Sequence, residues 1–270
     1  MRRKEHPVPD TNTSRVIAVA NQKGGTGKST IAVNVAVALG ERGKRVLLVD
    51  VDPQADATTM LGVDPAECKR TLYDVFLGDC ELPDAVVAAV APGVDLAVGT
   101  ERMASVEMTL ASALMRERYL HQALEGHVDA YDLVLIDCPP NLGLLTVNAF
   151  CAAPEVLVVV SMTDRNAYKG AMALMATVNS LRRNRVDVAV MGVVRNNVDR
   201  HRSTYRLLNE ALVDGGLPLL ATEIPLRADF QNAVTAGLPL LTFSPDHVGA
   251  LAIRRLASEL IGDAADRRAA

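Results

Sequence analysis

Residues 16–39 read VIAVANQKGGTGKSTIAVNVAVAL, and this stretch decides the fold. Its centre fits the phosphate-binding pattern G-x-x-x-x-G-K-[ST], with Gln22 in place of the first glycine and an additional Lys23 at the front of the loop. Glycines let successive backbone N–H groups curl round a phosphate, since no Cβ blocks the approach. In such a loop the Lys28 ammonium reaches the β- and γ-phosphates, and the Ser29 hydroxyl ligates Mg²⁺. The candidate nucleotide-binding residues of the loop are Gly24, Gly25, Thr26, Gly27, Lys28, Ser29 and Thr30.

The loop lies between a predicted strand and a predicted helix. Residues 16–20 form an apolar run typical of a buried parallel strand, and the helix that follows points its N-terminus at the anion. Similar apolar runs predict strands at 45–49, 94–98, 133–136, 156–160, 186–194 and 219–224. Helices are predicted at about 29–42, 71–78, 104–125, 143–152, 166–184, 202–214, 228–236 and 247–261. This alternation indicates an α/β fold: a doubly wound, mostly parallel sheet with helices on both faces, P-loop NTPase-like, with ligands outside the carboxyl ends of its strands.

Composition limits the class of protein. The 270 residues are 49% hydrophobic, enough for a sizeable core, and no apolar run approaches the roughly 18 residues of a membrane helix. We therefore expect a flexible arm over 1–14, a single P-loop ATPase domain over 15–262 and a polar tail over 263–270, in a cytoplasmic protein that does not bind membranes. The four cysteines form no C-x-x-C pair, which argues against a zinc site or a disulfide framework.

Two predicted strands end in aspartates that can serve a nucleotide. Asp50 and Asp52 follow one strand, and Asp137 follows four apolar residues in the Walker-B form. Carboxylates at such strand ends hold Mg²⁺ through water or orient the attacking water. The alternative for Asp52 is that Asp52-Pro53 only opens a turn. The candidate magnesium ligands are Ser29, Asp50 and Asp137.

The ends of two later strands can hold the base. Asn196 or Asn197 can hydrogen-bond an adenine edge, although a loop asparagine that caps the next helix explains the spacing nearly as well. Pro225 closes the last predicted strand and can supply an apolar wall for the base. We therefore include Asn196 and Pro225 among the candidate nucleotide-binding residues.

Positive charge is concentrated in one segment. The net charge is −4, yet residues 181–206 hold seven arginines against two aspartates, so that segment is +5 and the remainder −9. Arginines contact phosphates without reading bases, whereas the common alternative is a solvated helix face. Aromatic residues make up only 3%, which leaves little for stacking on bases. The candidate DNA-binding residues are Arg182, Arg183, Arg195, Arg200, Arg202, Arg206 and Arg227.

A family resemblance follows from these motifs in order. The stretches KGGTGKST, DVDPQADATT, DCPPNLGLLTVNAF, IPLRADFQNAVTAG and LPLLTFSPDHVGALAIRRLASEL resemble the ParA group of deviant Walker A ATPases over about residues 15–261. The resemblance implies Mg²⁺-ATP binding, an ATP-dependent homodimer, and slow hydrolysis stimulated by a ParB-type centromere-binding protein. It further implies non-specific binding to DNA and association with the nucleoid, used to partition plasmids or chromosomes.

The resemblance also implies roles for single residues. Lys23 is similar to the signature lysine that reaches the nucleotide of the other subunit, and Lys28 to the P-loop lysine. Asp52 matches the carboxylate that positions the hydrolytic water. The catalytic residues implied are thus Lys23, Lys28 and Asp52. The chain departs most from the family pattern at 161–166. Because the arm of 1–14 is short, we expect no DNA-reading domain of the kind found at the front of longer relatives.

Three other functions share this nucleotide chemistry. A MinD-type ATPase positions itself on a membrane, but the C-terminal residues show no amphipathic pattern for that purpose. An iron–sulfur reductase needs two cysteines per subunit at a shared cluster, and Cys138 lacks a glycine-rich surround. A partitioning ATPase with a protein cargo stays open, because the partner selects the cargo.

Overall fold

Within residues 14–262, which the computed structural model describes, eight strands form one sheet. The strand order is β3-β4-β2-β5-β1-β6-β7-β8, and every neighbouring pair is parallel except β3 and β4. The predicted doubly wound, mostly parallel sheet is thereby confirmed. The strands are β1 (Arg15–Ala20), β2 (Val46–Asp50), β3 (Val86–Ala91), β4 (Val94–Ala97), β5 (Leu133–Asp137), β6 (Glu155–Ser161), β7 (Ala189–Val198) and β8 (Leu219–Pro225).

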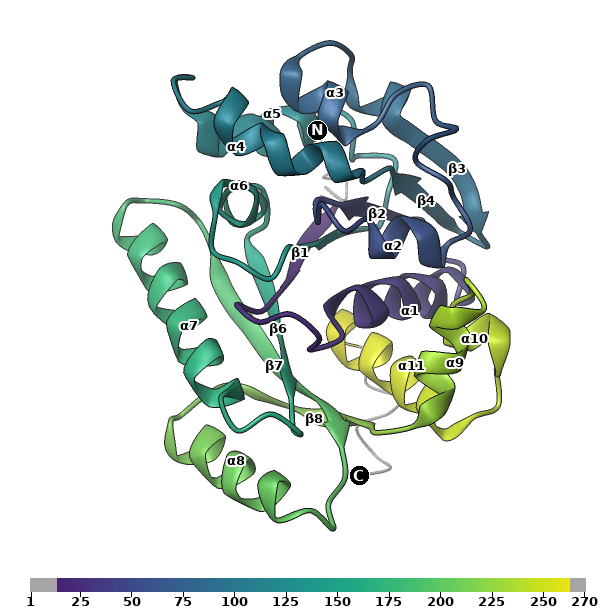
Figure 1. The fold of residues 1–270 in the computed structure, drawn as a ribbon, viewed down its shortest axis with the longest axis vertical. Coiled ribbons are helices and arrows are strands. Elements are labelled where there is room, and N and C mark those ends of the chain that lie inside the picture. The colour runs from purple at the N-terminus through teal and green to yellow at the C-terminus, as the bar shows by residue number, and fades with distance from the viewer. Residues whose placement is uncertain (1–13, 263–270) are drawn as a thin grey trace, which may run out of the picture.

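Helices cover both faces of the sheet (Figure 1). Ile17 and Val19 of β1 pack in one core with α1 (Lys28–Gly40) and α11 (Val248–Ile261). The intervening Ala18 belongs to a second core with helices of the opposite face. Because both faces are buried, the strands read as continuous apolar runs. The remaining helices are α2 (Asp56–Met60), α3 (Leu72–Leu77), α4 (Val106–Thr109), α5 (Tyr119–Leu124), α6 (Leu144–Ala152), α7 (Ala167–Arg183), α8 (Ser203–Asp214), α9 (Ala228–Thr235) and α10 (Leu240–Phe243), with 3₁₀ turns at Leu82–Ala85, Glu101–Ser105 and Arg116–Arg118.

The structure corrects two predicted elements and adds a strand at the edge of the sheet. The single helix predicted at 104–125 is wrong, because that segment holds only short helical pieces, and Met115 takes a left-handed φ of 50° that no helix continues through. The edge strand β3 was not predicted, although it forms a hairpin with β4 across two residues. β7 continues to Val198, so Asn196 and Asn197 lie within the strand and not in a loop after it.

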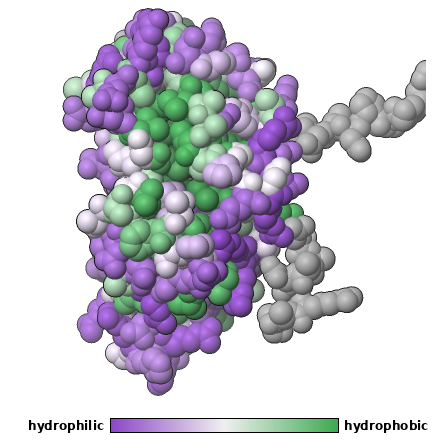
Figure 2. All heavy atoms as spheres, turned by 90° about the vertical axis from the view of Figure 1, so that its right-hand side faces the viewer, coloured by the Kyte–Doolittle hydropathy of each residue, from purple (hydrophilic) through white to green (hydrophobic). Residues whose placement is uncertain are grey.

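The two edges of the sheet differ. The six residues of β3 are all Val or Ala, and hydrophobic residues gather at the height of this strand on the face shown in Figure 2. At the other edge, the Glu259 side chain of α11 accepts hydrogen bonds from the amides of Ala221 and Thr222 in β8, at 2.7 and 2.9 Å. Edge amides that are already paired cannot recruit another strand. The β8 edge is therefore closed by the protein's own helix.

The ends of the predicted domain are described only in part. Residues 1–13 and the predicted tail over 263–270 lie outside the described residues. Ser14, the last residue of the predicted arm, lies within hydrogen-bond distance of the carbonyls of Val128 and Tyr131, each at 2.6 Å. Over residues 14–262, none of the helices has the length and apolar character needed to span a membrane.

Candidate nucleotide-binding site

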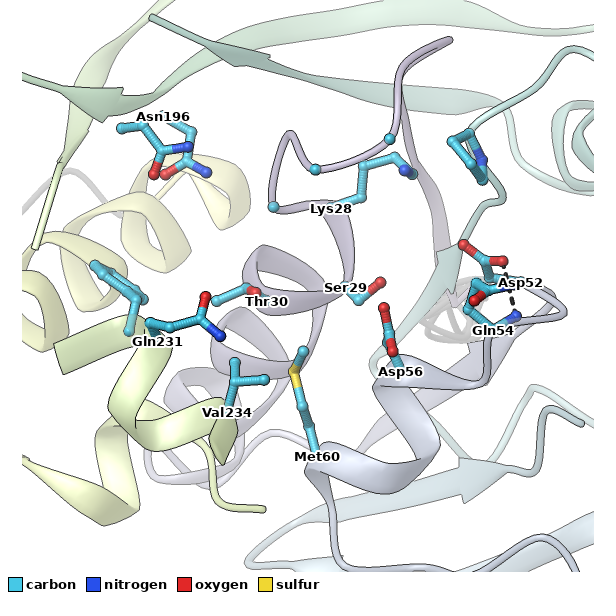
Figure 3. A pocket seen from close by; sticks show the side chains of 16 residues that line it. Lys28, Ser29, Thr30, Asp52, Gln54, Asp56, Met60, Asn196, Gln231 and Val234 are labelled. Atoms are coloured by element: carbon cyan, nitrogen blue, oxygen red, sulfur yellow. Dashed lines mark hydrogen bonds between the residues drawn. The ribbon is translucent and has the colours of Figure 1, made fainter. Parts of the chain in front are cut away.

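A cavity of about 390 Å³ opens at the carboxyl ends of the central strands (Figure 3). The cavity is lined by the loop after β1, the segment after β2, Pro140 after β5, the end of β7 and helix α9. The strand order brings these segments together, although they are far apart in the sequence. Every residue of the predicted loop except Thr26 lines the cavity, namely Gly24, Gly25, Gly27, Lys28, Ser29 and Thr30.

The phosphate loop ends where α1 begins. Gly27 precedes the helix with a left-handed φ of 88°, a conformation that favours glycine, and a Cβ at this position would run into the Asn196 amide. No described side chain caps the N-terminus of α1. The first N–H groups of the helix are therefore available to an anion, and the helix dipole adds positive potential there. Lys28 is buried beside them, in the wall of the cavity.

Asp137 is a buried carboxylate at the end of β5. Neither of its oxygens accepts a hydrogen bond from the described residues in the structure. Burial raises the pKa of Asp137 well above its usual range, and the charge of Asp50 on the neighbouring strand raises this pKa further. The Ser29 hydroxyl and the Lys28 ammonium lower it. An orphaned carboxylate beside a hydroxyl is a donor set that suits Mg²⁺, which prefers oxygen ligands.

No group of three or more His, Cys, Asp or Glu side chains in residues 14–262 is arranged to hold a metal alone. Mg²⁺ usually keeps water and phosphate oxygens and takes only one or two protein ligands, so this finding fits Ser29 and Asp137 as its ligands.

Asp50 lies behind the site and not in its wall. Like Asp137, it does not line the cavity, but unlike Asp137 its carboxylate is already bonded: its Oδ2 accepts hydrogen bonds from both the amide and the hydroxyl of Thr58, each at 2.8 Å. Burial raises the pKa of Asp50 to about 7, and the Thr58 hydrogen bonds oppose this rise. The Gly99 amide donates to the same hydroxyl at 3.0 Å, and a Cβ at Gly99 would lie 2.7 Å from the Asp50 carboxyl carbon. Asp50 thus anchors α2 to the sheet.

Asp52 lines the cavity. Its Oδ1 accepts a hydrogen bond from the Gln54 amide at 3.0 Å, which fixes the carboxylate (Figure 3). Burial raises the pKa of Asp52, and the Lys28 charge opposes this rise. Asp56, which the sequence analysis missed, points towards Ser29 from the first turn of α2. The two carboxylates thus face the loop from the same segment.

Lys23 lies outside the cavity wall. Its ammonium forms an ion pair with the Oδ2 of Asp164, in the turn between β6 and α7. This turn belongs to 161–166, the segment that departs from the family pattern, and no sequence motif indicated the contact. In the single chain the loop's first lysine therefore binds its own subunit.

The base side of the cavity corrects the prediction in part. Asn196 lines the cavity, but its Nδ2 donates to the Thr26 carbonyl at 2.7 Å and so supports the phosphate loop. Pro225 does not line the cavity. Asn197, the alternative for the adenine edge, also lines the cavity. Four other side chains that line it here were missed: Met60 of α2 and Phe230, Gln231 and Val234 of α9. The spacing 230, 231 and 234 puts these three on one face of a helix, which was the available signal.

The predicted arginines do not form one surface. Arg182 and Arg183 end α7, before β7 begins, whereas Arg200, Arg202, Arg206 and Arg227 follow the carboxyl ends of β7 and β8. The ten residues of β7 span roughly 30 Å between the two groups. The guanidinium groups of Arg182, Arg183 and Arg206 have no ion-pair partner within the described part of the chain.

Arg195 is turned inwards and is not part of a surface. Its Nη1 lies 2.8 Å from Glu223 on β8, and it also binds Asn209 and the Leu220 carbonyl. Glu223 accepts further bonds from Arg200 at 2.7 Å and from the Tyr205 hydroxyl at 2.7 Å. Because its guanidinium group pairs with Glu223 inside the fold, we no longer count Arg195 among the candidate DNA-binding residues.

Comparison with known proteins gives a consistent set of relatives. A family model described as AAA domain matches residues 14–190. The chain is 36% identical over 262 residues to the chromosome partitioning protein ParA of Caulobacter vibrioides (strain NA1000 / CB15N), covering 96% of this chain and 98% of ParA. A solved structure of cobyrinic acid a,c-diamide synthase from Mycobacterium smegmatis with bound ADP and magnesium has 33% identity and a TM-score of 0.81, covering 92% and 94% of the two chains. The cell division ATPase MinD of Pyrococcus furiosus has 28% identity and a TM-score of 0.78, covering 92% of this chain and 99% of MinD.

Proposed function

The chain belongs to the AAA-domain family of P-loop ATPases that includes ParA, and on that premise we propose that it is a partitioning ATPase. It binds Mg²⁺-ATP in the cavity, forms a homodimer with ATP bound, and hydrolyses ATP slowly when a ParB-type partner stimulates it. The single observation that supports this most strongly is the buried Asp137 carboxylate, which accepts no hydrogen bond from residues 14–262 and lies beside Ser29 and Lys28 at an uncapped helix N-terminus. The Asp137 carboxylate and the Ser29 hydroxyl suit a cation, and the Lys28 ammonium and the helix N-terminus suit an adjacent anion. Mg²⁺-ATP carries both charges.

The residues divide the chemistry among them. The amides of the loop and the Lys28 ammonium hold the phosphates, and Ser29 and Asp137 hold the metal. When bound, Mg²⁺ neutralises the charge that develops on the transferring phosphoryl group. Asp52, fixed by Gln54, accepts a hydrogen bond from the attacking water and orients it. Lys23 leaves its own subunit and contacts the nucleotide of the other, so that the dimer depends on ATP.

The test of the site is nucleotide binding with and without the metal. Titration of the purified chain with ATP should show binding in Mg²⁺ that weakens in EDTA and in an Asp137→Asn variant. Wild-type affinity for ATP in both conditions and in the variant would contradict the proposed metal site.

We further propose that the protein binds DNA without sequence preference. Phosphate contacts by Arg206 and Arg227, at the carboxyl edge of the sheet, would place DNA on the same side as the nucleotide and the dimer contact, and would explain an association with the nucleoid. The double variant Arg206→Ala with Arg227→Ala should bind DNA more weakly and lower the salt slope by about 2. Arg182→Ala with Arg183→Ala tests the other edge, and Arg118→Ala, an exposed arginine outside both groups, serves as control. Unchanged binding in both double variants would remove the arginines from the proposal.

A second candidate is a positioning ATPase for a protein cargo or a membrane site. The likeness to the MinD structure supports a positioning ATPase, although it supports membership of the family equally. Flotation with anionic liposomes in ATP distinguishes the two. Recovery with liposomes but not with DNA would replace partitioning by membrane positioning.

A further inference from the structure

Hydrogen bonds fix the backbone of Lys23, whereas its side chain is held only by the ion pair with Asp164. Its amide donates to the Asn21 Oδ1 at 3.2 Å, and its carbonyl accepts a hydrogen bond from the Thr26 hydroxyl at 3.4 Å. Asn21 in turn donates to the Val159 carbonyl in β6, which ties the front of the loop to the sheet. Only the four-carbon side chain of Lys23 can therefore move between partners.

Asp164 is held rigidly at the other side of the ion pair. Its Oδ1 accepts a hydrogen bond from the Asn166 amide at 3.0 Å, and its own amide donates to the Ser161 carbonyl at 3.3 Å. This leaves Oδ2 for the Lys23 ammonium. The hydrogen bond from Lys23 lowers the pKa of Asp164, so the carboxylate is charged at neutral pH and the pair is ionic.

The pair is weak enough to exchange. The Lys23 side chain is 48% exposed and that of Asp164 is 21% exposed, so water competes with the pair. The triphosphate of a second subunit carries more negative charge than one carboxylate, and an ammonium brought close to it would leave Asp164. A single ammonium does not serve both partners at full strength.

We propose that Asp164 is a positioning residue that holds Lys23 in its own subunit until the nucleotide of a second subunit displaces it. The inference rests on the proposed ATP-dependent dimer. We call the Lys23–Asp164 ion pair the latch. Each dimer that forms breaks two latches, one per subunit, so the latch sets how much nucleotide and protein are needed for dimerisation. It opposes premature pairing of subunits and leaves the chemistry of each cavity unchanged.

The experiment measures dimer dissociation of the full chain with Mg²⁺ and a non-hydrolysable ATP analogue by sedimentation equilibrium. Asp164→Asn keeps the shape of the side chain and removes its charge. The Asp164→Asn monomers no longer have the two exposed ion pairs that dimerisation breaks, so the variant dimer should be about two- to thirtyfold tighter. The matched control is Glu41→Gln, which breaks the Glu41–Arg254 pair, of similar exposure, at the far end of α1. That control should leave the dimer unchanged.

A double-mutant cycle separates the latch from a merely structural role. In a Lys23→Gln background, where the dimer is expected to be weaker, Asp164→Asn should not change the dimer dissociation constant further, because the carboxylate acts only through the lysine. Asp164→Glu should return the dimer towards the wild-type affinity. If the wild-type chain dimerises and Asp164→Asn leaves the dimer affinity unchanged or lowers it, the latch is wrong but the proposed function stands. If neither protein dimerises with the analogue, both the latch and the proposed function fail, and a dimer only in Asp164→Asn supports the latch strongly.

Discussion

Replacing Asn196 by alanine tests whether this residue supports the phosphate loop or reads the base. Its Nδ2 donates to the Thr26 carbonyl at 2.7 Å, and both residues are buried. The alanine variant leaves that carbonyl without its donor and removes the contact against which Gly27 packs. The loop should then lose its order, and every nucleoside triphosphate should bind more weakly.

The magnitude follows from the buried carbonyl. Leaving a buried acceptor unsatisfied costs about 1–3 kcal/mol, which lowers affinity by about 5- to 150-fold if the full penalty falls on the bound loop. Because the contact is to the loop and not to the base, ATP and GTP should lose the same factor. The ratio of their affinities should therefore stay at its wild-type value.

Fluorescence titrations with labelled ATP and GTP in Mg²⁺ measure both factors. The control is Asn232→Ala, an exposed asparagine on α9 next to the cavity residue Gln231. A thermal melt of each variant shows whether the fold is retained. If Asn196→Ala weakened ATP at least tenfold more than GTP, Asn196 would be reading the adenine, and the support role would be refuted.

Four other substitutions test the remaining assignments. Lys28→Ala should lower ATP affinity by about 100-fold, measured by titration, because a charge-assisted contact to phosphate is lost; unchanged affinity would contradict the site. Asp52→Ala should keep ATP binding and the dimer but lower turnover by about 100-fold or more, and normal phosphate release would exclude its role with water. Glu223→Ala should lower the free energy of unfolding by about 3 kcal/mol in urea, since it leaves the largely buried Arg195 without its counter-charge. Burial raises the pKa of Asp50 from 3.8 to about 7, so the native state holds a proton that the unfolded chain releases, and stability without Mg²⁺ should fall as pH rises from about 4 to 7. Asp50→Asn should lessen this fall, the buried Asp137 carboxyl contributing the rest, and an unchanged profile would disprove the cause.

The sequence by itself determined the parts of the protein that depend on neighbours along the chain. The glycine spacing of the phosphate loop, the apolar runs of the parallel strands and the aspartate that ends β5 are each legible within a few residues. Backbone conformation and burial on both faces leave a local pattern, because they constrain residues at fixed spacing. For the same reason the sequence failed at 104–125, where an apparently helical pattern is interrupted at Met115.

Only the tertiary structure decided which side chains meet across the sheet. Asn196 lies 170 residues from Thr26, and Lys23 lies 141 residues from Asp164, yet each pair forms a hydrogen bond. A run of arginines shows positive charge in the sequence, but Glu223 on the neighbouring strand turns Arg195 inwards. The apolar sequence of a strand indicates that the strand is buried, but it does not indicate which strands pair with it. The strand order supplies those neighbours, and with them the partners of every polar group at the site.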